Sequence, residues 1–200
     1  MANKVLVISG TASPKDKSFS IALQNKFVEE YKKLNSDDEF IYLDLNDEKM
    51  AQITLSRDNM KDFFNQEDAL NYIEQLKSVN KVIIASPMNN FAVSAMIKNY
   101  LDHILLANQT FSYKYSKKGD AKGLLDHLSV QVLTTQGAPI GWYPFGDHTN
   151  YLKGTWEFVG AKVNHPICFA GTKLEPVVSM DPNQAILQVE SEIIKAAKSF

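Results

Sequence analysis

The sequence predicts an α/β fold: a doubly wound parallel sheet of five strands in the order 2-1-3-4-5, with helices on both faces. Strand-like and helix-like segments alternate along the chain, as in βαβ units. The first and third strand-like segments, KVLVIS and KVIIAS, are continuous apolar runs, which is typical of strands buried on both sides. A chain of 200 residues with 44% hydrophobic content can bury a sizeable core, so we expect one domain, residues 1–200.

Five strands and five helices follow in strict alternation. The expected strands are Lys4–Ser9, Phe40–Leu45, Lys81–Ser86, Leu128–Thr134 and Val163–Phe169. The expected helices are Ser18–Leu34, Glu67–Val79, Val93–Ala107, Thr149–Val159 and Pro182–Lys198. In this strand order, ligands bind beyond the carboxyl ends of strands one, three and four. The loops at those three ends are therefore the candidate site.

Two longer segments, 46–65 and 108–122, interrupt the alternation. Long connections in compact domains are often functional. The second contains alternating aromatic residues, so we expect a short hairpin with Phe111, Tyr113 and Tyr115 on one face and Gly119 at its return. This face has two interpretations: a ligand wall or dimer contact, and ordinary packing under a loop.

Composition argues against several classes of partner. The net charge of −2 provides no basic surface for nucleic acid. The single cysteine cannot form an internal disulfide, and the first residues lack the apolar stretch of a signal peptide, so we expect a cytoplasmic protein. No apolar run approaches the roughly 20 residues that span a bilayer, so no membrane role is expected.

The turn after the first strand is rich in small and hydroxyl residues. A helix N-terminus has unsatisfied N–H groups and partial positive charge, so the hydroxyls of Ser18 and Ser20, with Lys15 or Lys17, suit a phosphate. The alternative is that Ser18 is only a helix cap. A P-loop is excluded because Lys15-Asp16 stand where Gly-Lys is required, and no Gly-x-Gly-x-x-Gly follows the strand. A mononucleotide with one terminal phosphate fits better.

Two further turns suit a flat polar ring. Strand three ends at Pro87-Met88-Asn89-Asn90-Phe91, where Pro cannot continue the ladder and Asn tolerates unusual backbone angles, so N–H groups can point outward. Strand four ends at Thr134-Thr135-Gln136-Gly137, followed by Ala138, and glycine allows close approach of a ligand. We expect these turns to bracket a planar heterocycle with their backbone N–H and C=O groups and the Asn90 amide.

The motifs TASP (11–14), SFS (18–20), PMNNF (87–91), KNYLD (98–102), TFxY (110–113) and GL (123–124) occur in order across most of the chain. Together they resemble the FMN-dependent NADH-azoreductases. The resemblance implies a flavodoxin-like fold, a homodimer and tightly held FMN. It also implies reduction of quinones and azo compounds with NADH as electron donor.

Carried over by position, the resemblance implies three groups of FMN contacts. The phosphate would be held by Thr11, Ser18, Phe19 and Ser20; the isoalloxazine would be lined by Pro87, Met88, Asn89, Asn90 and Phe91; and its pyrimidine edge would face Thr134, Thr135, Gln136 and Gly137. Two positions depart from the family pattern: Asn89 replaces an aromatic residue, and Ala138 replaces the second of two glycines.

The implied mechanism is a ping-pong transfer of hydride in which the flavin carries the chemistry, so no catalytic side chain is expected. The backbone N–H of Asn90 is the expected partner of flavin N5. Quinones need one flavin cycle and azo bonds need two, which favours quinones as acceptors.

One alternative is a flavodoxin-type electron carrier without NADH turnover. The nearly neutral charge argues against it, as does the absence of a Thr/Ser-Gly-Asn-Thr loop. Another alternative is an interaction module that has lost flavin.

The remaining candidates have mostly structural interpretations. The four histidines lack metal-ligand spacing, so no metal is expected. For His148 we favour a helix-start or surface role over substrate contact, and Cys168 lies in an apolar strand as a small hydrophobe. The aromatic loop 141–145 is either a lid over the flavin or an interface anchor.

Overall fold

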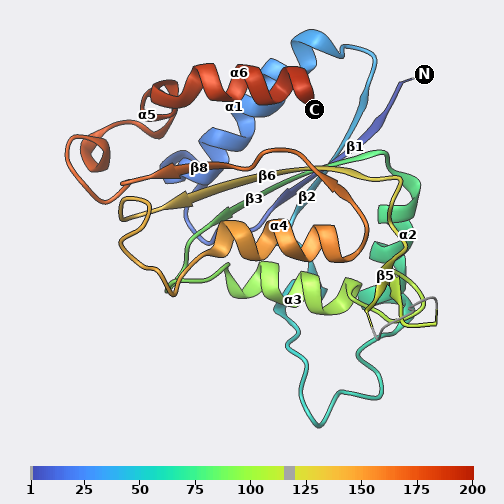
Figure 1. The fold of residues 1–200 in the computed structure, drawn as a ribbon. Helices are drawn as coiled ribbons and strands as arrows, with labels where there is room; N and C mark the ends of the chain where they lie inside the picture. Colours follow the sequence, from blue (N-terminus) through green and yellow to red (C-terminus); the bar gives the residue numbers. More distant parts are fainter. Residues whose placement is uncertain (1, 115–119) are drawn as a thin grey trace.

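The computed structural model describes residues 2–114 and 120–200, and it has the predicted three-layer architecture (Figure 1). The central sheet has the order β2-β1-β3-β6-β7, with β8 also paired to β6, and every pairing in it is parallel. Its strands are β1 (Lys4–Ser9), β2 (Glu39–Asp44), β3 (Lys81–Pro87), β6 (Ser129–Gln136), β7 (Lys162–Val163) and β8 (Ile167–Ala170). The predicted order 2-1-3-4-5 is confirmed, with β7 and β8 together in the place of strand five.

Helices cover both faces of the sheet (Figure 1). On one face lie α1 (Phe19–Leu34), α5 (Pro182–Ile186) and α6 (Glu190–Ser199), and on the other lie α2 (Asn71–Ser78), α3 (Ala95–Ile104) and α4 (His148–Phe158). Alternate residues of β1 serve the two cores, because Val5 and Val7 pack with α1 while Leu6 and Ile8 pack with α3. None of the described helices is long and apolar enough to cross a membrane.

The predicted fifth strand, Val163–Phe169, is wrong as a single element. It is divided into β7 and β8, which pair with the two ends of β6. Between them, the buried Gln131 side chain donates from Nε2 to the His165 carbonyl at 3.0 Å and accepts from Asn164 Nδ2 at 2.8 Å. Pro166 has no N–H for the ladder. A buried carboxamide therefore takes the hydrogen bonds that a continuous strand would have made.

Two predicted helices also differ from the observed ones. The segment Glu67–Val79 begins as a π-helical turn, η3 (Gln66–Leu70), and continues as α2. The segment Pro182–Lys198 contains a 3-10 turn, η5 (Leu187–Val189), which separates α5 from α6. The remaining boundaries shift by a few residues. For example, α3 starts at Ala95 because the Ser94 hydroxyl caps it, accepting from the Ile97 N–H at 3.3 Å.

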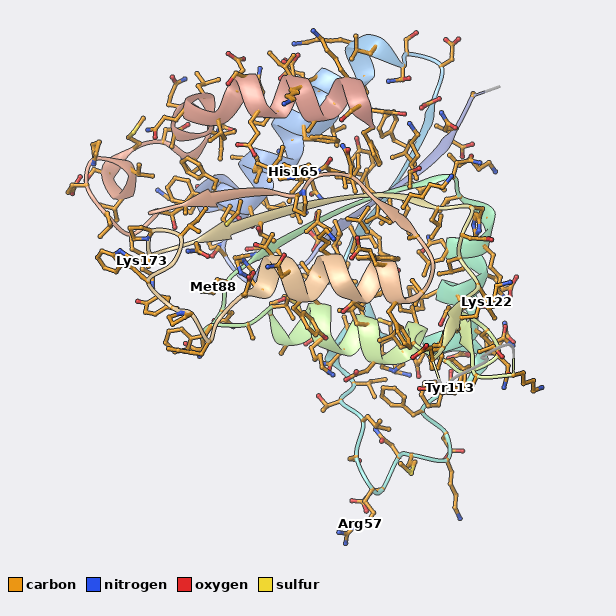
Figure 2. The ribbon with its side chains drawn as sticks, viewed as in Figure 1. Arg57, Met88, Tyr113, Lys122, His165 and Lys173 are labelled. Carbon is orange, nitrogen blue, oxygen red and sulfur yellow. The ribbon has the colours of Figure 1, made fainter. Side chains whose placement is uncertain are left out.

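The two irregular segments are placed differently. In the second, β4 (Phe111–Ser112) pairs antiparallel with β5 (Lys122–Gly123), which confirms a hairpin; Tyr115 and Gly119 lie outside the described residues. The Phe111 and Tyr113 rings lie 5.5 Å apart on one face, and Phe111 packs on Phe158 of α4. In the first, η2 (Lys49–Gln52) enters the core, and the following loop projects from the body with Arg57 at its tip (Figure 2).

Candidate functional site

Three hydroxyl groups meet at the N-terminus of α1. Ser18 Oγ lies 3.3 Å from Thr11 Oγ1 and 3.0 Å from Ser20 Oγ, and all three side chains are buried. Ser18 also caps α1, because its hydroxyl accepts the Ile21 N–H at 3.3 Å. The cap and the hydroxyl cluster are therefore the same feature, and the cluster faces the positive end of the helix dipole.

The two neighbouring lysines have different surroundings. Lys15 Nζ binds Asp44 Oδ2 at the end of β2 at 2.8 Å, and this hydrogen bond raises the pKa of the Lys15 ammonium. Lys17 instead lines the cavity beside the hydroxyl cluster. Asn46 fixes the loop from the other side, because its Nδ2 donates to the Thr11 carbonyl at 2.9 Å. Of the two lysines proposed from the sequence, only Lys17 is placed at the cavity.

The turn after β3 leaves two backbone N–H groups without a described acceptor. Asn89 and Ala92 exchange backbone hydrogen bonds of 2.8 and 3.2 Å, and the two residues between them have positive φ, 47° for Asn90 and 70° for Phe91. This is the geometry of a tight primed turn. Within the described part of the chain, the N–H groups of Asn90 and Phe91 have no protein acceptor. A bulky residue such as Phe91 with positive φ is an outlier of the kind that clusters at ligand sites.

The carbonyl groups of the turn after β6 already accept hydrogen bonds within the protein. The carbonyls of Gln136, Gly137 and Ala138 accept the N–H groups of Thr172, Lys173 and Gly171 at 3.1, 3.0 and 3.1 Å. This turn is also tied to the one after β3, since the Met88 N–H donates to the Thr135 carbonyl at 2.7 Å. Ala138 does not have a positive φ, so alanine is accommodated there without strain.

These turns enclose a cavity of about 160 Å³ at the carboxyl ends of β1, β3 and β6. It is lined by Thr11, Ser13, Lys17, Ser18, Phe19, Ser20, Pro87, Met88, Thr135, Gln136, Gly137, Thr172 and Lys173. The other predicted residues lie outside this lining. Thr134 is buried with its hydroxyl 2.7 Å from that of Thr149, while Asn89, Asn90 and Phe91 form the adjoining turn. Sequence reasoning missed Thr172 and Lys173, although both follow β8 at the same edge of the sheet.

The aromatic loop folds onto the turn after β3. The rings of Tyr143 and Phe145 lie 4.9 and 5.0 Å from the Phe91 ring. A second cavity, of about 340 Å³, lies between this cluster and α4 and includes His148 and Tyr151 in its lining. His148 starts α4 as expected, but it is not on the surface, because only 2% of it is exposed. Burial lowers the pKa of its imidazole, and a hydrogen bond to the Thr135 backbone opposes that shift in part.

The strand order and the location of the cavity define a flavodoxin-like α/β protein. A family profile described as "Flavodoxin-like fold" matches residues 3–193. A relative from Malacoplasma penetrans, named an FMN-dependent NADH:quinone oxidoreductase, is 58% identical over 98% of this chain and 93% of its own. One of the same name from Mycoplasmopsis pulmonis is 56% identical over 98% and 99%. A Bacillus anthracis FMN-dependent NADH-azoreductase, solved in complex with FMN, has a TM-score of 0.74 at 26% identity, covering 98% and 99%.

The chain therefore belongs to the family described as having a flavodoxin-like fold, together with relatives that are named FMN-dependent NADH:quinone oxidoreductase.

Proposed function

We propose that this protein is an FMN-dependent NADH oxidoreductase that reduces quinones by two electrons and cleaves aromatic azo compounds. The observation that carries the proposal is the convergence of the buried hydroxyl cluster with two turns that present free N–H groups at one sheet edge. The names of relatives at 56 to 58% identity support the same reaction. Bound FMN would supply the redox chemistry, accepting a hydride from NADH and passing two electrons to the acceptor.

The donor set at α1 fits the FMN phosphate. Thr11, Ser18 and Ser20 supply hydroxyl donors, the first turn of α1 supplies backbone N–H groups, and Lys17 adds a positive charge. No aspartate or glutamate is among the described residues that line this cavity. The described lining thus offers a phosphate dianion hydroxyl and N–H donors and positive charge without a carboxylate, and we assign its binding to Thr11, Ser18, Phe19 and Ser20.

The two turns fit the ring of FMN. Residues 87–91 would line the isoalloxazine, with the Asn90 N–H as the donor to flavin N5, because that N–H has no acceptor among the described residues and its turn is fixed by the Asn89–Ala92 pair. Residues 135–137 would face the pyrimidine edge. The preceding residue, Thr134, is fixed by the hydrogen bond between its hydroxyl and that of Thr149. The chain thus binds and orients the ring through its backbone and needs no nucleophilic side chain.

The aromatic cluster suits the acceptor. Phe91, Tyr143 and Phe145 present flat apolar surface beside the proposed ring site, and such surface excludes water and matches quinones and aromatic azo compounds. Because one quinone consumes one hydride and one azo bond consumes two, we propose quinones as the physiological acceptors.

We propose a homodimer that works in the cytoplasm. Large aromatic side chains near the site are exposed, including Trp142 at 62% and Phe145 at 73%, and exposed clusters of this kind mark protein interfaces. The single cysteine, Cys168, is free, as is usual in reducing compartments. Sedimentation of the FMN-loaded protein at several concentrations tests the dimer, and cell fractionation tests the compartment.

Steady-state kinetics test the activity. Initial rates with varied NADH at several fixed menadione concentrations are expected to give parallel double-reciprocal lines, the pattern of a ping-pong mechanism. Under the same conditions a quinone is expected to turn over faster than an azo dye. Intersecting lines would contradict the mechanism, a faster azo dye would contradict the ranking of acceptors, and absence of NADH oxidation would refute the enzyme itself.

A further inference from the structure

Lys173 is a charged residue at the candidate site that the sequence motifs do not include. It follows β8 and lines the same cavity as the hydroxyl cluster of Thr11, Ser18 and Ser20. Figure 2 places Lys173 beside Met88, at the end of the sheet away from Lys122 and Tyr113. Its aliphatic arm crosses the turn after β6: a Cβ built on Gly137 would lie 2.8 Å from Lys173 Cδ.

The backbone around Lys173 is pinned to that turn. Three consecutive N–H groups, those of Gly171, Thr172 and Lys173, bond the carbonyls of Ala138, Gln136 and Gly137 at 3.0 to 3.1 Å. Thr172 Oγ1 adds a bond to the Gln136 carbonyl at 3.2 Å. The side chain of Lys173 therefore extends from a fixed backbone, and its aliphatic arm lies against Gly137.

The same hydrogen bonds favour one edge of a ring at this turn. The carbonyls of residues 136–138 already accept N–H groups, whereas the N–H groups of Gly137 and Ala138 have no acceptor in the described part of the chain. The turn therefore suits the acceptor atoms of the flavin pyrimidine, N1 and the C2 carbonyl. Bound FMN would gain negative charge at N1 and the C2 oxygen when it accepts a hydride from NADH, and with this edge at Gly137 that charge would lie near Lys173.

The charge of Lys173 is free to act there. Among the described residues neither Lys173 nor Lys17 is paired with a carboxylate, whereas Lys15, which lies outside the cavity, is paired with Asp44. The described lining contains these two lysines and no acidic side chain. Lys17 directly precedes the Ser18 cap, whereas the arm of Lys173 lies against Gly137, so the two lysines reach the cavity from different loops.

We propose that Lys173 is an electrostatic positioning residue that favours the reduced form of bound flavin. It places a positive charge beside the N1–C2 edge, where reduction adds a negative charge, and thereby raises the two-electron potential of the cofactor. The proposal rests on the proposed function, and it differs from a phosphate contact in one respect. A phosphate contact strengthens the binding of oxidised and reduced FMN equally, whereas Lys173 strengthens the binding of the reduced form selectively.

The test is the ratio of affinities for reduced and oxidised FMN, obtained from the midpoint potential of the FMN-loaded protein by anaerobic titration against a reference dye. Lys173→Met keeps the aliphatic arm and removes the charge, and it is expected to lower this ratio about tenfold, which is about 30 mV for a two-electron couple. Lys173→Arg keeps the charge and is expected to change the ratio less than twofold. The control, Lys198→Met on the exposed end of α6, is also expected to stay within twofold.

Two outcomes would overturn the proposal alone. One is a Lys173→Met protein that NADH still reduces, with a ratio within twofold of the unaltered protein. The other is equal weakening of oxidised and reduced FMN, which would assign Lys173 to the phosphate. Failure of the unaltered protein to bind FMN, or of NADH to reduce it, would refute the proposed function and this proposal together.

Discussion

The double role of Ser18 leads to a prediction in which stability and cofactor affinity respond differently. Its hydroxyl caps α1 through the Ile21 N–H and stands in the hydroxyl cluster with Thr11 and Ser20. Ser18→Ala removes both functions. Loss of the cap is expected to cost about 1 kcal/mol of unfolding free energy. Loss of a charge-assisted hydrogen bond to phosphate, about 1.5 to 3 kcal/mol, is expected to raise the FMN Kd roughly 10- to 150-fold.

Ser18→Asp separates the two effects. Aspartate caps a helix about as well as serine, and its charge suits the helix N-terminus, so the unfolding free energy is expected to stay within about 0.5 kcal/mol. Its carboxylate, however, occupies the place of the phosphate and repels it. We expect this variant to bind FMN more weakly than Ser18→Ala does, although it is more stable.

Urea denaturation without flavin gives the stabilities, and fluorescence titration with FMN and riboflavin gives the affinities. Riboflavin lacks the phosphate, so both variants are expected to bind it as the unaltered protein does. Equal loss of FMN and riboflavin affinity would show that Ser18 supports the ring or the fold instead of the phosphate. Unchanged FMN affinity in Ser18→Asp would refute the phosphate assignment.

Three further predictions follow. Asn90 has a φ of 47°, so Asn90→Ala is expected to strain the turn by about 1 kcal/mol and weaken FMN binding, measured by fluorescence titration. Both variants keep the backbone N–H, but glycine adopts a positive φ without strain, so Asn90→Gly is expected to retain FMN; equal loss in both would implicate the side chain. His103 is fully buried, its Nε2 has no partner in the described part of the chain, and burial lowers its pKa. In urea titrations the unfolding free energy is therefore expected to fall as the pH drops below the ordinary value of 6.5, and to fall less in His103→Phe; identical pH profiles would contradict this. Trp156 is fully buried, so Trp156→Ala is expected to lower the free energy of unfolding by about 3 to 5 kcal/mol. Trp142 is exposed, so the control Trp142→Ala is expected to lower it by less than about 0.5 kcal/mol. Similar losses in the two variants would contradict the packing described.

The sequence predicts those parts of the fold that depend on local pattern. The apolar runs of β1 and β3 identify central strands, and the alternation of elements leads to the observed strand order. The hydroxyl-rich turn before α1 and the Asn-rich turn after β3 identify the two ends of the candidate site, because capping chemistry and tolerance of positive φ are properties of the residues themselves.

The remaining features depend on contacts between distant segments. The division of strand five requires the Gln131 carboxamide, which is 33 residues before Asn164. The choice between Lys15 and Lys17 depends on Asp44, and the loss of free carbonyls after β6 depends on residues 171–173. The burial of His148 cannot be predicted from the sequence either, because Asp147-His148 is a pattern typical of an exposed helix start.

The most direct test of the central claim follows the two half-reactions on the protein itself. FMN-loaded protein is mixed anaerobically with NADH, its flavin absorbance is recorded, and menadione is then added. The account predicts that NADH bleaches the flavin band and that menadione restores it. A bound flavin that NADH and NADPH both leave oxidised would contradict the account and favour an electron carrier without nicotinamide turnover.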